Sequence, residues 1–324
     1  MRNYNVLVTA ISGDVGNSIL KCLARDPYLQ NLYGCDIFRY PCGINKVKGF
    51  FQVVPCANTK VYLRQILEII DQCEINLIVP ANEQEIQVFD RYREVFLSHG
   101  IQVLLHRREI YDWFSDKYKT AELLKNLGLP FIETSYTETV DRDIQFPAVI
   151  KDVFSCGSKD IHIVNNWNEF ARYSRNTRDQ IVQKYVGSPE EEYTVPVFSN
   201  GKKDDIVCFP FRRTLSKAGY TNFLEPVDED NRKRIEEICR KISAFIRLEG
   251  AVDFQMRREN GEFYIFECNP RLSGTVNFRA QLGFEDAVWW THLAMGEMEE
   301  VQFAMPEKRF VGIRELDEII FYPK

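Results

Sequence analysis

The amino-acid sequence predicts a mixed fold, in which a parallel α/β sheet over the first third of the chain precedes mostly antiparallel α+β structure. Two observations support this prediction. Short β-rich apolar runs alternate with helical periodicity between residues 4 and 105, and such alternation is typical of a parallel sheet with right-handed crossovers. From residue 146 onward, β-rich runs follow one another through short turns, which favours antiparallel pairing.

Composition and charge restrict the classes of function. Of the 324 residues, 45% are hydrophobic and 27% are charged, which is ordinary for a globular protein of about two domains. The net charge of −6 argues against a dedicated nucleic-acid binder. No apolar run approaches the ~18 residues of a membrane span, and the start MRNYNVLVTA does not resemble a signal peptide. We therefore expect a cytoplasmic protein with neither a nucleic-acid nor a membrane partner.

The cysteines and histidines suggest no site of their own. The nine cysteines form no CxxC pair, which argues against a zinc site or a disulfide framework and favours reduced thiols. The four histidines show no metal-ligand spacing and no partner for a catalytic triad. We assign them no role.

The elements of the first third follow from periodicity. The run from Tyr4 to Thr9 is typical of a strand, and after a glycine turn helical periodicity continues to Leu23. The segment from Thr59 to Cys73 places its apolar residues on one stripe of a helix. The remaining predicted elements are strands at 33–37, 75–79 and 101–105 and a helix at 83–97.

The glycine turn after the first strand leaves three interpretations open. Gly13 and Gly16 form GxxG rather than GxGxxG, and Asp36 lies where the ribose-binding acid of a dinucleotide site is expected. NAD binding is therefore one interpretation, and a plain tight turn is another. In the third, the strand ends and the helix N-terminus hold a carboxylate-bearing substrate.

The middle of the chain predicts a capped helix. Ser115 or Asp116 caps a helix that begins near Lys117, Gly128 ends it, and Pro130 follows. The remaining predicted elements are strands at 146–151, 161–164, 181–187, 193–198 and 206–211 and a helix at 232–247.

A small polar loop at 155–160 lies between two of these strands. Gly and Ser at such a position suit a flexible flap whose backbone N–H groups wrap phosphate oxygens. A plain hairpin fits the same residues.

The clearest candidate site lies on a predicted hairpin near the C-terminal end. With a three-residue loop at 259–261, Asp253 lies directly opposite Glu267, and Asn269 shares their face. Two facing carboxylates repel unless a cation lies between them, and an amide oxygen completes a set suited to Mg²⁺. A two-residue loop would separate the two carboxylates onto opposite faces. The alternative is a pair of surface acids on a solvated hairpin.

Seven segments of the chain occur in a characteristic order. They are Asp116-Lys117 with its helix end at Gly128-Leu129-Pro130, Phe146 to Lys151, Gly157-Ser158, Gln183 to Gly187, Glu192-Tyr193-Thr194, Asp253, and Glu267 to Arg271. Together they resemble the ATP-grasp superfamily, in particular one ATP-grasp unit of the carbamoyl-phosphate synthase large subunit. The resemblance implies a Rossmann-like domain at 1–108, a small flap lobe at 109–187, and a C-terminal lobe with the metal site at 188–324.

The resemblance implies ATP and Mg²⁺ as cofactors, with Mn²⁺ as an alternative metal. Lys117 and Lys151 would hold the nucleotide phosphates from two sides of a cleft, and Glu192 would take the ribose hydroxyls. The remaining nucleotide contacts would come from the flap residues Ser155, Gly157 and Ser158 and from backbone groups of the hinge residues Gln183, Lys184, Tyr185 and Val186.

The same resemblance implies a catalytic centre. Asp253, Glu267 and Asn269 would ligate the metal. Arg271, together with Lys151, would steady the transferring phosphoryl group, and Arg213 is a weaker candidate for that role. The loop Ser273-Gly274 would form one edge of the acid pocket.

Two positions depart from the family pattern. The flap has a single glycine, Gly157, and Asp160 stands where glycine is common, so we expect slower closure or fewer phosphate contacts unless Lys159 compensates. Gln183 stands where a glutamate is usual, which would change the contact with adenine.

The implied function is an ATP-dependent ligase that joins a small carboxylate to an amine or a thiol. The carboxylate attacks the γ-phosphoryl group of ATP, and the amine then displaces phosphate from the acyl phosphate. The alternatives are carbamoyl-phosphate-type chemistry on bicarbonate and a nucleotide-binding module without turnover. A homodimer is expected from the frequency of dimers alone.

Overall fold

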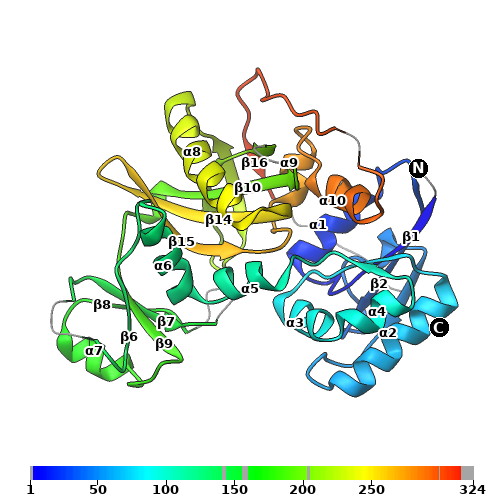
Figure 1. Cartoon of the computed structure of the whole chain (residues 1–324), viewed down its shortest axis with the longest axis horizontal. Helices are drawn as coiled ribbons and strands as arrows, with labels where there is room; N and C mark the ends of the chain where they lie inside the picture. The colour runs from blue at the N-terminus through cyan, green and yellow to red at the C-terminus, as the bar shows by residue number, and fades with distance from the viewer. Residues whose placement is uncertain (1–2, 141–143, 155–159, 203–204, 299, 315–324) are drawn as a thin grey trace.

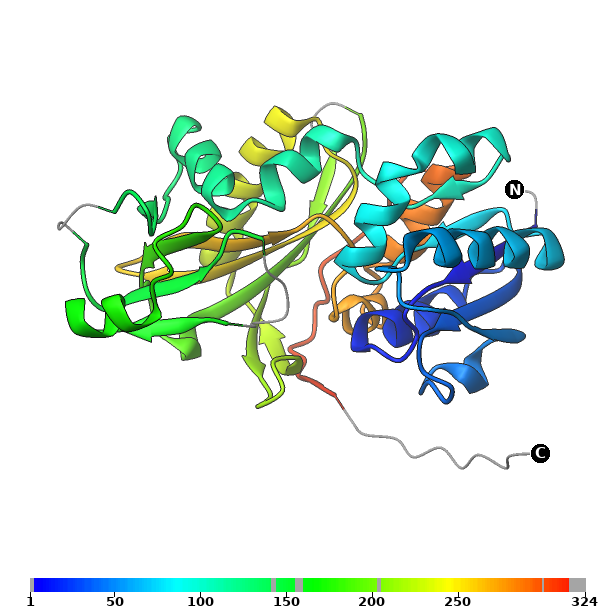
Figure 2. The ribbon, with the colours of Figure 1, turned by 90° about the horizontal axis from the view of Figure 1, so that it is seen from below.

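The computed structural model describes residues 3–140, 144–154, 160–202, 205–298 and 300–314. These residues form three sheets, and the seven-stranded sheet lies between the five-stranded N-terminal sheet and the four-stranded sheet (Figures 1 and 2). The predicted combination of a parallel N-terminal sheet with antiparallel sheets is confirmed.

The N-terminal sheet is parallel, in the order β3-β2-β1-β4-β5. Its strands are β1 (Tyr4–Val8), β2 (Leu29–Asp36), β3 (Gly49–Gln52), β4 (Leu77–Val79) and β5 (Gln102–Val103). The helices of this unit are α1 (Asp14–Leu23), α2 (Thr59–Cys73), α3 (Glu83–Arg91) and α4 (Arg93–Ser98), with a short 3₁₀ turn, η1 (Ile44–Lys46). Helix α2 has the predicted bounds, whereas the predicted helix 83–97 divides at Tyr92.

Helices pack on both faces of this sheet, and successive side chains of β1 point to opposite faces. Val6 and Val8 pack with α1, whereas Leu7 packs with α2 on the opposite face. Helices α9 (Val276–Ala280) and α10 (Asp286–Ala294) join the core on the α1 side. Because these two helices come from the C-terminal part of the chain, they connect the N-terminal sheet to the seven-stranded sheet (Figure 1).

The glycine turn after β1 is a tight strand-to-helix turn. A Cβ atom on Gly16 would lie 2.4 Å from the carbonyl oxygen of Ala10, so only glycine fits there. Asp36 is buried, and its carboxylate accepts hydrogen bonds from the backbone N–H groups of Ser12 (2.7 Å) and Phe38 (3.0 Å). These bonds account for the buried carboxylate of Asp36 without a bound ribose, so the dinucleotide interpretation gains no support.

The four-stranded sheet is antiparallel, in the order β6-β9-β7-β8. Its strands are β6 (Thr134–Tyr136), β7 (Ala148–Asp152), β8 (His162–Val164) and β9 (Gln180–Lys184). Helix α7 (Trp167–Tyr173) packs on it through Phe170.

The seven-stranded sheet has the order β15-β14-β10-β12-β13-β16, with β11 beside β10. Its strands are β10 (Glu192–Asn200), β11 (Ile206–Cys208), β12 (Phe211–Leu215), β13 (Thr221–Pro226), β14 (Glu249–Glu259), β15 (Glu262–Asn269) and β16 (Gly312–Ile313). A 3₁₀ turn, η2 (Pro189–Glu191), precedes β10, and the helix predicted at 232–247 is present as α8 (Glu229–Ile246).

Helices α5 (Arg108–Phe114) and α6 (Lys117–Asn126) share a hydrophobic core with α8 and the seven-stranded sheet. The sequence groups both helices with the small lobe at 109–187, so the division into domains stays a prediction. Asp116 caps α6 as expected, because its side chain accepts hydrogen bonds from the backbone N–H groups of Tyr118 (2.9 Å) and Lys119 (3.1 Å).

Within the described ranges, no helix combines the length and the apolar character that crossing a bilayer requires.

Glu85 of α3 is a buried carboxyl group in the N-terminal unit. It accepts hydrogen bonds from the hydroxyl groups of Thr9 (2.7 Å) and Tyr62 (2.6 Å). Burial is the largest influence on this group, and it raises the pKa of Glu85 to about 7. The carboxyl group therefore titrates near neutral pH in the folded protein.

Replacing Glu85 by Gln should remove part of the pH dependence of stability. Folding raises the pKa of Glu85 from 4.5 to about 7, so the folded state binds more protons in this window. The free energy of unfolding of the wild type therefore falls as the pH rises through it. In urea denaturation, the stability of the wild type relative to E85Q should fall by about 3 kcal/mol between pH 4.5 and pH 7. Parallel pH profiles would contradict a titrating Glu85.

Candidate active site

A cleft with a volume of 410 Å³ is lined by residues of the four-stranded and the seven-stranded sheets. Asp14, at the start of α1, lines it as well. Most of the predicted site residues line this cleft, and they are Lys117, Lys151, Gln183, Lys184, Tyr185, Glu192, Arg213, Glu267, Asn269 and Arg271. The predicted loop residues Ser273 and Gly274 do so too.

Three predicted nucleotide contacts, Ser155, Gly157 and Ser158, lie outside the described residues. Val186 is buried and does not line the cleft, and neither does Asp253.

The β14–β15 hairpin differs from the predicted register. Its loop has two residues, Asn260 and Gly261, which both have positive φ (52° and 85°), as a tight hairpin turn requires. The predicted three-residue loop is therefore wrong. Farther along, Met256 pairs with Ile265 but Gln255 pairs with Glu267, so one extra residue forms a β-bulge in β15.

The extra residue is Phe266, and the bulge decides which side chains share a face. A two-residue loop alone would place Asp253 and Glu267 on opposite faces. Because the bulge shifts the register by one residue, Asp253 pairs with Asn269 and Gln255 pairs with Glu267. All four side chains then belong to the same face, although Asp253 is not directly opposite Glu267 as the sequence predicts.

Asp253 lies beneath the cleft and not in it. Its side chain is fully buried, and its oxygens accept hydrogen bonds from the hydroxyl groups of Thr194 (2.9 Å to each oxygen) and Ser273 (2.8 Å). A carboxylate with these partners holds the loop that contains Ser273 against β10. This arrangement argues against a direct metal contact from Asp253.

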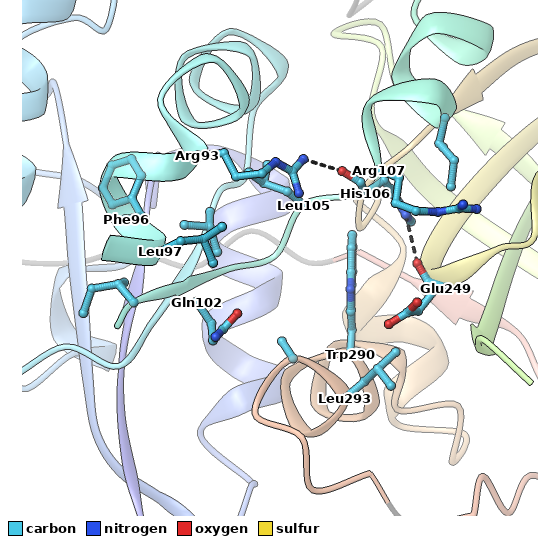
Figure 3. Close-up of a pocket in the computed structure, with 14 residues that line it drawn as sticks. Arg93, Phe96, Leu97, Gln102, Leu105, His106, Arg107, Glu249, Trp290 and Leu293 are labelled. Carbon is cyan, nitrogen blue, oxygen red and sulfur yellow. Dashed lines mark hydrogen bonds between the residues drawn. The ribbon is translucent and has the colours of Figure 1, made fainter. Parts of the chain in front are cut away.

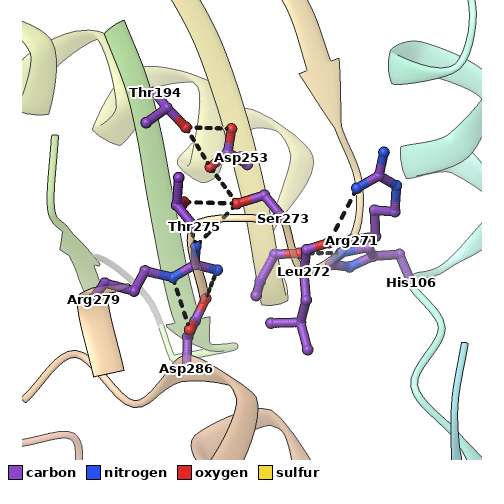
Figure 4. A network of polar contacts seen from close by, with 10 residues as sticks. His106, Thr194, Asp253, Arg271, Leu272, Ser273, Thr275, Arg279 and Asp286 are labelled. Carbon is purple, nitrogen blue, oxygen red and sulfur yellow. Dashed lines mark hydrogen bonds and ion pairs between the residues drawn. The ribbon is translucent and has the colours of Figure 1, made fainter. Parts of the chain in front are cut away.

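Ser273 continues this network toward the C-terminal helices (Figure 4). Arg279 donates hydrogen bonds to the hydroxyl groups of Ser273 (2.9 Å) and Thr275 (2.8 Å). It also donates two hydrogen bonds to the buried carboxylate of Asp286 (2.9 and 2.6 Å). The loop at 273–275, which lines the cleft, is therefore fixed from below by buried charged groups.

Gln255 is the site residue that sequence reasoning missed. It lines the cleft directly opposite Glu267, and Asn269 lines it two residues farther along β15. The side chains of these three residues make no hydrogen bond with the described part of the chain, so their oxygens are available to a ligand. Gln255 lies opposite Glu267 only because of the bulge. The alternation of side chains in the sequence does not reveal a bulge, so no signal in the sequence identified Gln255.

One carboxylate and two amides form a donor set made of oxygen ligands, which fits Mg²⁺ when phosphate oxygens or water complete the shell. Glu267 would supply the single negative charge. Among the described residues, no group of three or more His, Cys, Asp or Glu side chains is placed to hold a metal ion. We therefore transfer the proposed ligand role of Asp253 to Gln255 and keep Glu267 and Asn269.

The two predicted phosphate-binding lysines come from adjacent elements rather than from two sides of the cleft. The backbone N–H and the ammonium group of Lys117 both donate hydrogen bonds to the carbonyl oxygen of Val153 (3.4 Å each), two residues after Lys151. Lys117 is the first residue of α6, and Lys151 lies on β7. The ammonium group of Lys151 donates a hydrogen bond to the carbonyl oxygen of Phe266 (3.1 Å), the bulge residue. Burial lowers the pKa of Lys151 to about 7, and the nearby charge of Lys117 adds to this effect. A polyanionic ligand would stabilise the charged form of Lys151.

The carboxylate of Glu192 is held by two arginines. Its Oε1 accepts hydrogen bonds from Nε (3.2 Å) and Nη2 (2.9 Å) of Arg213, and its Oε2 accepts from Nε (3.1 Å) and Nη2 (2.9 Å) of Arg257. Glu192 is only 4% exposed. Arg213 and Arg257 both line the cleft, and Arg257 is a second residue that the sequence did not single out.

The hinge residues at 183–186 connect the four-stranded sheet to the seven-stranded one. The amide of Gln183 donates a hydrogen bond to the hydroxyl group of Thr134 (2.7 Å), and Lys184 forms an ion pair with Glu259 (2.7 Å). The backbone N–H of Tyr185 donates to the carbonyl oxygen of Pro147 (2.9 Å). The side chains of Gln183 and Lys184 therefore fix the hinge, and Tyr185 contributes to the cleft wall.

Arg271 reaches toward the N-terminal unit. Its guanidinium group lies 3.5 Å from the carboxylate of Glu83, the first residue of α3, and its Nε is buried without a hydrogen-bond partner in the described part of the chain. A donor in this state is costly to leave unsatisfied. Arg271 is therefore suited to an anionic ligand at this end of the cleft.

A second cavity, of 300 Å³, lies between α4, β5, the linker to α5 and α10 (Figure 3). Its buried histidine, His106, has Nδ1 3.0 Å from the carbonyl oxygen of Glu249 and Nε2 2.8 Å from that of Ala251. Burial lowers the pKa of His106 to about 4. The ring packs against Trp290, so we assign His106 to holding the linker against β14.

Comparisons with known proteins relate the chain to a known family. The sequence model of the ATP-grasp domain matches residues 114–275, and that of the PylC-like N-terminal domain matches residues 31–104. The C-terminal section of the carbamoyl phosphate synthase large chain of Aquifex aeolicus is 25% identical over 225 residues, which are 62% of this chain and 40% of that protein. The chain thus spans less than half the length of this relative.

Solved structures show the same fold. The biotin carboxylase domain of 2-oxoglutarate carboxylase from Hydrogenobacter thermophilus, solved with MgADP, ADP and bicarbonate, has a TM-score of 0.75 and 14% identity. The match covers 96% of this chain and 74% of that one. N5-carboxyaminoimidazole ribonucleotide synthetase, solved with ADP, also has a TM-score of 0.75, at 12% identity and with 96% and 81% coverage.

Replacing Asp253 by Asn should destabilise the protein. The substitution removes the charge that two buried hydroxyl groups donate to, and hydrogen bonds to charged groups are worth about 2 kcal/mol. Chemical denaturation should show a loss of about this size. The matched control is Asp230→Asn in the exposed first turn of α8, which should change stability by less than about 0.5 kcal/mol. Equal stability of D253N and the wild type would contradict a buried structural carboxylate.

Proposed function

The chain belongs to the ATP-grasp family, and from this premise we propose that it is an ADP-forming ligase that joins a small carboxylic acid to an amine or a thiol. The observation that supports this most is the content of the cleft. The cationic side chains of Lys117 in α6, Lys151 on β7 and Arg271 just after β15 line the same cleft as the oxygen donors Gln255, Glu267 and Asn269. This combination of side chains suits a nucleoside triphosphate with a divalent cation.

We assign the nucleotide phosphates to Lys117 and Lys151. The two lysines come from different elements and line the same cleft, and a lysine is a compact donor for phosphate oxygens. The base would lie near Tyr185, at the hinge end of the cleft. The flap residues Ser155, Gly157 and Ser158 keep their proposed phosphate contacts.

We assign the metal to Gln255, Glu267 and Asn269. When bound, Mg²⁺ supplies neutralisation of the phosphate charge, and Mn²⁺ is the alternative ion. These residues would hold the ion together, because the bulge at Phe266 brings Gln255, Glu267 and Asn269 to the same face of the hairpin.

The acid substrate would lie between Arg271 and the N-terminus of α1. The loop at 273–275 approaches α1 so closely that a Cβ atom on Gly274 would lie 2.2 Å from Oδ2 of Asp14. Asp14 and Gly274 both line the cleft. An anionic carboxylate in this space would satisfy the buried guanidinium group of Arg271.

The proposed reaction has two steps. An oxygen of the substrate carboxylate attacks the γ-phosphorus of ATP, the bond from this phosphorus to the β–γ bridging oxygen breaks, and ADP forms with an acyl phosphate. The amine or thiol then attacks the acyl carbon, loses its proton, and phosphate leaves. Lys151 and Arg271 would stabilise the charge of the transferring group, and exclusion of water would protect the acyl phosphate.

Carbamoyl-phosphate-type chemistry on bicarbonate is the competing proposal, since the relatives named above include a carbamoyl phosphate synthase section. A nucleotide-binding module without turnover is the second competitor.

A hydroxylamine trap separates these functions. The proposed ligase should release ADP and form a hydroxamate only when a particular acid from a pooled amino-acid and peptide screen is present. Carbamoyl phosphate formed from bicarbonate and ammonia would support the competing chemistry. ATP binding without release of ADP in the whole screen would overturn the ligase proposal.

Replacing Lys151 by Ala should weaken ATP binding by about 1–3 kcal/mol, because a charge-assisted hydrogen bond to phosphate is lost. Isothermal titration calorimetry measures this change. Lys241→Ala, which removes an exposed lysine from α8, is the matched control and should bind ATP like the wild type. An unchanged dissociation constant for K151A would remove Lys151 from the site.

Replacing Glu267 by Gln should abolish release of ADP while the protein stays folded, because the variant lacks the only charged ligand of the proposed metal set. A coupled assay for ADP and a thermal melt measure the two properties. Glu262→Gln changes an exposed glutamate of the same strand and should keep wild-type turnover. Wild-type turnover in E267Q would disprove the metal assignment.

A further inference from the structure

We propose that Arg257 is the platform on which the nucleotide base stacks, and that Glu192 is the positioning residue that holds its guanidinium group in place. This inference rests on the proposed nucleotide site. It assigns a function to Arg257 and a new one to Glu192.

The position of Arg257 along β14 places it at the base end of the cleft. It follows Gln255 by two residues, so both side chains belong to the same face of the strand, and both line the cleft. Gln255 faces the proposed metal and phosphates. Arg257 is therefore one step farther along the sheet from the phosphates.

Aromatic contacts mark the same end. The guanidinium carbon of Arg257 lies 5.0 Å from the ring centroid of Tyr185 and 5.5 Å from that of Phe266. Tyr185 belongs to the hinge, beside which the base is proposed to lie. The ammonium group of Lys151 lies 5.9 Å from the ring of Phe266 as well. The ring of Phe266 thus has a phosphate-binding lysine and the platform arginine both within contact distance.

A guanidinium group is planar, and it stacks on aromatic faces more effectively than the ammonium group of a lysine does. Tyr185, Phe266 and Arg257 provide flat or apolar surfaces at one end of the cleft, and a nucleotide base is a flat aromatic ligand. Cation–π contact and stacking with a base need no particular hydrogen-bonding edge. Arg257 would therefore contribute affinity for the base, not for the phosphates.

Glu192 has no acceptor position left for a ribose hydroxyl group. Arg257 lies directly opposite Glu192 in the register of β10 and β14. Each carboxylate oxygen of Glu192 already accepts two N–H groups, from Arg213 on one side and Arg257 on the other. Two acceptor positions for each oxygen are then used. A ribose hydroxyl would have to displace one of these charge-assisted bonds.

The test compares a nucleotide with a polyphosphate that has neither ribose nor base. ADP and inorganic tripolyphosphate are titrated calorimetrically into the wild type, R257A and R257K in one Mg²⁺-containing buffer. R257A should bind ADP about tenfold more weakly and tripolyphosphate as the wild type does. R257K keeps the charge but not the plane, so it should lose ADP affinity nearly as R257A does.

Two further variants complete the test. Arg212→Ala removes an exposed arginine of β12 that does not line the cleft, and it should bind both ligands normally. E192Q should weaken ADP and 2′,3′-dideoxy-ADP by the same factor, because it loosens the arginines and not a ribose contact. Thermal melts verify that each variant is folded.

The outcomes separate this inference from the proposed function. Equal weakening of ADP and tripolyphosphate in R257A, or full recovery of ADP binding in R257K, would overturn the platform role. A preference for ADP over its dideoxy form that is present in the wild type and lost in E192Q would return Glu192 to the ribose. A wild type that binds neither ADP nor tripolyphosphate would overturn the proposed function and this inference with it.

Discussion

The β-bulge at Phe266 is the constraint on which the site depends. The tight two-residue loop of the β14–β15 hairpin would by itself place Glu267 on the wrong face, and one extra residue restores it to the face of Gln255. The carbonyl oxygen of the same bulge residue accepts the hydrogen bond of Lys151. One irregularity of the backbone therefore aligns the proposed metal ligands and connects the two walls of the cleft.

The charged residues around the cleft have different structural roles. Asp253 and Glu192 are buried, and their oxygens are occupied by hydroxyl and guanidinium groups of the chain. They hold other residues in place. Glu267 lines the cleft without such a partner among the described residues, and Lys151 carries a pKa lowered by burial and by Lys117. The cleft is thus poor in accessible negative charge and would be stabilised by an anionic ligand.

Much of this arrangement could be predicted from local sequence. The apolar stripe of α2 and the Asp116 cap of α6 depend on neighbouring residues, and both elements are present as expected. The presence of the C-terminal hairpin follows from alternation. Its register does not, because the energy of a bulge depends on contacts with other strands and with Lys151. The error in register is the reason that Asp253 was predicted to face Glu267 and that Gln255 was left out of the proposed metal set.

Contacts between residues far apart in the sequence could not be predicted for the same reason. The pairing of Glu192 with Arg213 and Arg257 joins three strands whose paired residues are 21 and 65 positions apart in the sequence. A single sequence does not show which distant residues form such pairs. The family resemblance implied a ribose contact for Glu192, whereas both oxygens of its carboxylate accept hydrogen bonds from arginines of the chain.

The most direct measurement is the binding of Mn²⁺ in the presence of ADP, followed by electron paramagnetic resonance on the folded protein. If the bulge places Gln255, Glu267 and Asn269 around the cation, Gln255→Ala should weaken Mn²⁺ binding at least tenfold, whereas Asp253→Asn should bind it as the wild type does. Loss of Mn²⁺ binding in D253N, with normal binding in Q255A, would contradict the register and the site built on it.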